Sequence, residues 1–157
     1  MAALDVYSLL QNTKTMLSES TTWQTLTSSG AASAALAYIH EYGVDDDCEH
    51  QPPLIILDLE DLPLSWDGGN LAGTVQVLCR IELAIPESSA GTYANQGEWF
   101  WQQLSGILAD INGGVRDSGQ LMFSRLSMPL KPGRIEPDIN NGRVDWMCML
   151  AFETYLQ

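Results

Sequence analysis

Residues whose types could do chemistry are concentrated in a short acidic stretch that ends at two prolines. Three aspartates at 45–47 lead into Cys48 and then His50. Zinc takes about four nitrogen or sulfur ligands at characteristic spacing. The chain has one other histidine, His40, and its other two cysteines fall on predicted inward-facing strand positions. We therefore expect a polar loop here rather than a metal site.

A second group of acids follows a short apolar run. Asp58, Glu60 and Asp61 could form a carboxylate pair for general acid–base catalysis. Such a pair needs one member in an apolar pocket that raises its pKa. Asp58 and Glu60 are two residues apart on an extended segment, so they share one side of it. An exposed strand face is the better interpretation.

The remaining candidate motifs lack the residues that define them. Neither Gly68-Gly69 nor Gly113-Gly114 is followed by the Gly-Lys-Ser/Thr of a phosphate loop, and no serine stands in a nucleophile-elbow motif. The aromatic cluster Trp99 to Trp101 has no basic groove beside it, so it fits core or interface anchors better than base stacking. We expect no catalytic residues, no cofactor and no metal, hence not an enzyme.

Three segments carry clear periodicity and define the scaffold. Thr74 to Ile85 and Arg143 to Leu156 alternate with a period of two, as strands with one face on a core do. Glu98 to Asn112 has apolar residues at helical spacing. The predicted common core is Val75, Val77, Ile81, Leu83, Leu104, Ile107, Trp146, Leu150 and Phe152.

Weaker patterns complete a single α+β domain covering 1–157, a mostly antiparallel sheet with helices packed on one face. Further helical segments are expected at Leu4–Leu17 and Ser20–Thr27, and further strands at Ala35–Tyr42, Leu54–Pro63 and Leu121–Leu130. The glycines after Asn112 are expected to end the long helix, and Pro129 to close the last of those strands. Loops are expected at Pro86–Gln96 and Lys131–Gly142.

The charge balance excludes some function classes. Twenty acids against seven bases give a net charge of −13, and the first 79 residues hold only one base, Lys14. Tight nucleic-acid binding needs clustered Lys and Arg, which this chain lacks. With a mean hydropathy of −0.05 and no apolar run near the ~18 residues that span a bilayer, no membrane association is expected. The acidic N-terminus also predicts no secretion signal.

The second face of the two long strands is unusually apolar. Met147, Met149 and Ala151 share it with Leu78 of the earlier strand. A solvated sheet face should be more polar. Either the monomer partly covers this face itself, or a neighbouring subunit does. The second alternative predicts a subunit interface at these four residues.

The order of elements is familiar. A leading helix with a Ser/Thr-rich tail is followed by the Pro52-Pro53-Leu54-Ile55-Ile56 strand, the Gly73 to Leu83 strand, the Trp99 to Leu108 helix and the Arg143 to Glu153 strand. Over most of its length the chain resembles the tail terminator (tail completion) proteins of long-tailed, lambda-like bacteriophages. The resemblance lies in element order, size and loop placement, without a diagnostic motif.

That resemblance implies a structural virion protein, made in the host cytoplasm, that forms a homo-oligomeric, hexameric ring. Such a ring caps the tail tube protein, joins the tail to head and neck connector proteins, and lets DNA pass without specific binding. Within it, acids of the first half could form a negative channel or rim, or a solvated outer surface. These acids are Asp45, Asp46, Asp47, Asp58, Glu60, Asp61 and Asp67.

Two alternatives stay open. Another head-to-tail connector of a tailed phage would have similar size and composition. An acidic DNA-mimic inhibitor would use its carboxylates to occupy a basic nucleic-acid site, and would need regularly spaced acids over one exposed face.

Overall fold

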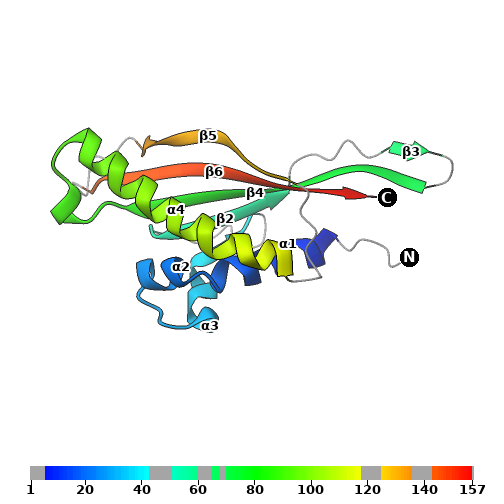
Figure 1. Cartoon of the computed structure of the whole chain (residues 1–157), viewed down its shortest axis with the longest axis horizontal. Coiled ribbons are helices and arrows are strands. Elements are labelled where there is room, and N and C mark those ends of the chain that lie inside the picture. The colour runs from blue at the N-terminus through cyan, green and yellow to red at the C-terminus, as the bar shows by residue number, and fades with distance from the viewer. Residues whose placement is uncertain are drawn as a thin grey trace.

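The computed structural model describes residues 6–42, 51–59, 65–67, 70–117, 125–135 and 143–156, and the structural statements below concern these residues. One face of a sheet is covered by a layer of helices, with the long helix α4 running across it (Figure 1). The α+β fold predicted from the sequence is confirmed.

Five strands form the main sheet in the order β1-β2-β4-β6-β5. Only the β1–β2 pair is parallel. The short β3 pairs with the outer end of β4, and this hairpin projects beyond the helix layer in Figure 1. The strands are β1 Ile39–Glu41, β2 Leu54–Leu59, β3 Ser65–Asp67, β4 Asn70–Ala84, β5 Arg125–Ile135 and β6 Asp145–Leu156.

The helices are α1 Val6–Ser18, α2 Thr21–Leu26, α3 Ala32–Ala35 and α4 Tyr93–Asp117, with short 3-10 turns at Leu36–Tyr38 (η1) and Glu87–Ser89 (η2). Hydroxyl side chains start two of them. The Ser20 hydroxyl accepts a hydrogen bond from the Trp23 backbone N–H at the start of α2. Thr92 accepts one from the Asn95 N–H at the start of α4. Both satisfy backbone donors that a helix terminus leaves unpaired.

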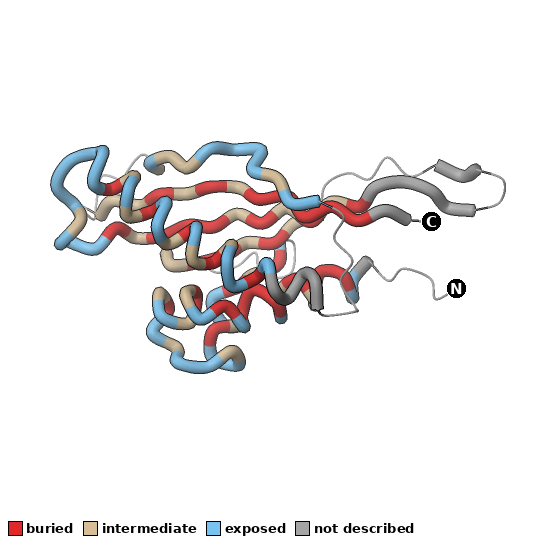
Figure 2. The backbone as a smooth tube through the Cα atoms, in the orientation of Figure 1, coloured by how far each residue is buried: buried red, intermediate tan, exposed pale blue. Residues whose placement is uncertain are grey.

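The core lies between the sheet and the helix layer, and all nine residues predicted for it are buried in one cluster. The register explains this, because Val77 lies opposite Phe152 and Ile81 opposite Cys148 on the face toward α4. Buried segments recur along β4 and β6 in Figure 2, whereas β5 is largely exposed. Trp146 closes one end of the core, and its indole N–H donates to Gln96 Oε1 at 3.2 Å.

A polar clamp joins α2 to α4. The Asp110 carboxylate of α4 accepts hydrogen bonds from the Ser20 and Thr21 hydroxyls, at 2.8 and 3.2 Å, and from the Thr22 backbone N–H at 2.8 Å. One turn earlier, Gly106 lets Thr22 approach closely, since a Cβ there would lie 2.7 Å from the Thr22 Oγ1. The clamp therefore holds α2 against α4 within the helix layer.

The long helix extends past both of its predicted ends. It begins at Tyr93 within the expected loop and continues through Gly113-Gly114 to Asp117, so the predicted stop after Asn112 is wrong. Glycine is favoured beyond a helix end because it can adopt positive φ, but inside a helix it costs only about 1 kcal/mol. The buried stripe that ends at Ile111 anchors the preceding turns and outweighs that cost.

The predicted closure of a strand at Pro129 is also wrong. β5 continues through Pro129 and Pro132 to Ile135, with register shifts between Ser127 and Leu130 and between Leu130 and Gly133. Proline is tolerated because β5 is an edge strand, where a missing N–H need not break a ladder. At the other edge, β1 is shorter than the predicted Ala35–Tyr42 strand, since α3 and η1 occupy its first half.

Candidate functional site

The four predicted interface residues lie together on the sheet face that points away from the helices, which we call the second face. Leu78 is directly opposite Ala151, and Met149 and Met147 follow along β6 opposite Arg80 and Glu82. Ala151 is buried and the other three predicted residues are half-buried. The structure brings these four residues together, and an interface role for them stays a prediction.

Several charged groups of the second face have partners within the chain. Arg80 forms an ion pair with Glu82 two residues along β4. Gln76 donates to Glu153 Oε1 at 2.6 Å, and Arg125 Nη1 lies 4.0 Å from Glu153 Oε2. Glu82 and Glu153 are mostly buried, at 7% and 9% exposure. An apolar partner surface would therefore cover the Arg80–Glu82 pair without leaving either of these two ions isolated.

Sequence reasoning missed this pairing, although a signal for it exists. Arg80 and Glu82 are two residues apart in a strand of period two, so their side chains must share a face. The Arg80 Nε is buried and has no hydrogen-bond partner among the described residues. Gln76 and Glu153 could not have been matched, because they meet only through the β4–β6 register.

The predicted acidic channel or rim falls almost entirely outside the described side chains. Residues 45–47, 60 and 61 lie outside the described ranges, and for Asp67 only the backbone of β3 is described. Asp58 is half-buried on the second face opposite Leu78, and its Oδ1 accepts from the Leu59 backbone N–H at 2.7 Å. The channel prediction is therefore untested.

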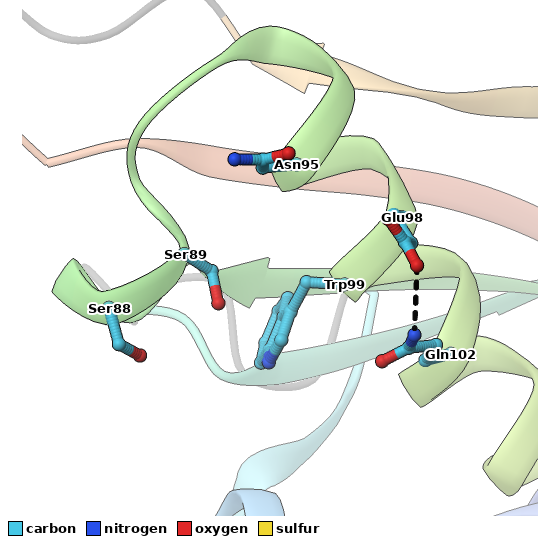
Figure 3. A pocket seen from close by; sticks show the side chains of 6 residues that line it. All are labelled: Ser88, Ser89, Asn95, Glu98, Trp99 and Gln102. Atoms are coloured by element: carbon cyan, nitrogen blue, oxygen red, sulfur yellow. Dashed lines mark hydrogen bonds between the residues drawn. The ribbon is translucent and has the colours of Figure 1, made fainter.

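One small hollow lies between η2 and the first turns of α4 (Figure 3). Its volume is about 230 Å³, and it is lined by Ser88, Ser89, Asn95, Glu98, Trp99 and Gln102. Glu98, the only carboxylate in this lining, accepts a hydrogen bond from Gln102 at 3.4 Å. None of the other five lining residues is an acid or a histidine, so these six residues do not form an acid–base pair.

The three residues of the aromatic cluster separate in space. Phe100 is fully buried, Trp99 is half-buried beside the hollow, and Trp101 is 46% exposed. Successive residues of a helix point about 100° apart, so such a triplet cannot all face one core. Phe100 is thus a core anchor as expected, while Trp101 is an exposed aromatic on α4.

The two cysteines predicted to be inward-facing are buried as free thiols in β4 and β6. Burial raises the pKa of Cys148 to about 12. Burial, reinforced by the nearby Cys148, raises the pKa of Cys79 well above its ordinary value. Thiols held protonated in this way are poor nucleophiles and poor metal ligands. Cys48 and His50 lie outside the described ranges.

Within the described ranges no cluster of three or more His, Cys, Asp or Glu side chains could hold a metal ion. None of the described helices is long and apolar enough to span a membrane. No protein-family model and no curated protein matches the chain.

Proposed function

We propose that this chain is a ring-forming structural subunit of a tailed bacteriophage, a tail terminator that caps the tail tube and joins it to the head or neck. The observation that carries the proposal is the second face, where Leu78, Met147, Met149 and Ala151 form a continuous apolar row. Beside that row, Arg80 and Glu82 are paired with each other, and Glu153 accepts a hydrogen bond from Gln76. Such a face suits burial against another protein.

The second face also fits a structural role better than an enzymatic one. The hollow beside α4 is small and polar with a single carboxylate in its lining, and the two described cysteines have raised pKa values. By contrast, the long β4–β6 pair and the clamped helix layer form a rigid scaffold that presents surfaces. The hexameric ring, and the tube protein and neck connectors as its partners, are what the resemblance in element order implies.

The net charge of −13 fits a passage through which DNA moves without adhering. Acids near a bore would repel phosphate over a Debye length of about 8–10 Å at physiological salt. A map of the assembled ring tests this part. A bore lined by aspartates 45–47 or by Asp58 would support it, and one lined mainly by Arg80, Arg125, Arg134 or Arg143 would replace repulsion by a DNA-gripping role.

The assembly itself is tested with the purified chain, alone and together with the tail tube protein encoded by the same phage. Mass photometry should show a species about six times the 17.3 kDa monomer, and negative-stain images should show rings. Added during tube polymerisation, the chain should stop elongation and leave short capped tubes. A chain that stays monomeric and leaves tube length unchanged would refute the proposal.

A further inference from the structure

The edge strand β5 differs in charge from the rest of the chain. It carries three of the seven bases, Arg125, Lys131 and Arg134, and none of the twenty acids. All three cations are exposed. In the described residues, Lys131 and Arg134 have no carboxylate within ion-pair distance, and Arg125 has one only at 4.0 Å. β5 is therefore a cationic edge on an anionic protein.

Exposed aliphatic side chains lie between these cations. Leu126, Met128 and Leu130 are 42%, 36% and 45% exposed. They are three of the eight large hydrophobic residues recorded as exposed in the described part of the chain. A strand edge with both cationic and aliphatic groups is better suited to a protein partner than to nucleic acid. The phosphate backbone of nucleic acid offers nothing apolar for the aliphatic groups to contact.

The backbone of β5 is poorly suited to adding another strand. Pro129 and Pro132 lack the N–H that a ladder needs, and both lie in the segment where the register with β6 shifts twice. Prolines and bulges are the devices that blunt edge strands against open-ended pairing. A partner would therefore meet β5 mainly through its side chains.

The opposite edge of the sheet has the complementary chemistry. β1 is flanked by Tyr38 and Tyr42, which are 36% and 70% exposed. The Tyr42 backbone N–H donates to the Leu57 carbonyl at 2.8 Å, so Tyr42 continues beside β2. The faces of tyrosine rings attract lysine and arginine.

We propose that β5 of one copy packs through its side chains against the β1 edge, at Tyr38 and Tyr42, of the next copy. A two-fold contact between two β5 strands would instead bring two sets of like charges together. Because the two surfaces differ, the contact is heterologous and can close into a ring. The inference rests on the proposed ring and adds an edge contact to the contact proposed for the second face.

Cross-linking between two single-cysteine variants tests the contact. Met128→Cys on β5 and Tyr42→Cys beside β1 are each made with Cys48→Ser, while the buried Cys79 and Cys148 remain in place. A short bis-maleimide spacer is applied to each variant alone and to an equal mixture, under the conditions of the assembly experiment. A cross-linked dimer should form only in the mixture, and Lys131→Glu combined with Arg134→Glu should abolish it.

Each other outcome has a defined meaning. A dimer of Met128→Cys with itself would show a two-fold contact and overturn the inference, as would one of Tyr42→Cys with itself. Rings of the wild-type chain without the mixed dimer would overturn this contact and leave the proposed function standing. Absence of both rings and dimer would overturn the two together. Binding of duplex DNA that Lys131→Glu abolishes would assign β5 to nucleic acid instead.

Discussion

The two faces of the β4–β6 pair are built from the same two strands but differ in what covers them. On the face toward the helices, Val77, Ile81 and Leu150 are fully buried and purely apolar. On the second face, half-buried methionines of β6 lie opposite Arg80 and Glu82 of β4, which are paired with each other. The first face is that of a monomer core, and the second has the composition of a protein interface.

The largest effect on folding is expected from truncation on the core face. Leu150→Ala removes a fully buried side chain that lies opposite Cys79 on the face toward the helices. The lost transfer free energy and the remaining cavity should lower the free energy of unfolding by about 2–5 kcal/mol. Urea unfolding followed by circular dichroism measures this loss.

Leu130→Ala is the matched control, because Leu130 lies on edge strand β5 and is 45% exposed. The same truncation there should change the free energy of unfolding by less than about 0.5 kcal/mol. Equal losses at the two leucines would mean that β5 is as deeply packed as the core face, and the contrast between the regions would fail.

A smaller effect is expected where the helix layer closes over the core. Gly106→Ala would place a methyl group 2.7 Å from the Thr22 Oγ1 and 3.0 Å from its Cγ2. Overpacking costs about 1–3 kcal/mol, and the better helix propensity of alanine offsets about 1 kcal/mol of this. Thermal unfolding should show that the free energy of unfolding falls by about 1 kcal/mol. Adding Thr22→Ala should recover part of it, whereas strict additivity of the two changes would rule out the close contact.

The clamp predicts a pH-dependent effect that is smaller again. Partial burial raises the pKa of Asp110, but hydrogen bonds from Thr22, Ser20 and Thr21 outweigh it and hold the pKa below its ordinary 3.8. A carboxylate whose pKa is lower in the folded than in the unfolded state stabilises the fold at pH values above its unfolded-state pKa. That stabilisation is lost as the pH falls through the folded-state pKa. Because this carboxylate is exposed, Asp110→Asn should cost only about 0.5–1 kcal/mol at pH 7. The difference should shrink below pH 4 in urea unfolding, and a constant difference at all pH values would exclude the linkage.

The sequence predicted the core face well because burial imposes a strict period. Every inward position from Val75 to Ile85 is buried, as is each of Trp146, Cys148, Leu150 and Phe152. A register slip of one residue would expose that whole set, so the pattern and the structure constrain each other strongly.

Element ends and the second face were predicted less well for physical reasons. Gly113-Gly114 is a weak local signal for a helix end, and packing of the preceding helical turns overrides it. Pro129 is a weak signal for a strand end, because β5 is an edge strand with one unpaired side. On the second face, the hydrogen bond from Gln76 to Glu153 joins residues 77 positions apart, which no local pattern encodes. The proposed assembly depends on other molecules, so the chain's own periodicity can only suggest it.

The smallest effect on folding, and the sharpest test of the comparison, is expected at the centre of the second face. Met149 is half-buried, with Arg80 directly opposite on β4. Met149→Glu would gain a nearby cation, so the free energy of unfolding should change by less than about 1 kcal/mol. A contact that covers this row would have to bury the added carboxylate, which costs several kcal/mol unless it is paired. Mass photometry should therefore show loss of the oligomer from a folded protein.

Two controls separate this interpretation from a general effect of charge. Ser105→Glu adds the same charge on the exposed side of α4 and should leave the oligomer intact. Leu150→Glu puts the charge one residue away on the core face, where it should unfold the chain rather than release folded subunits. If Met149→Glu assembles as the wild type does, the row from Leu78 to Met149 is not a subunit contact. The half-burial of that row would then belong to the monomer alone, and both faces would serve folding.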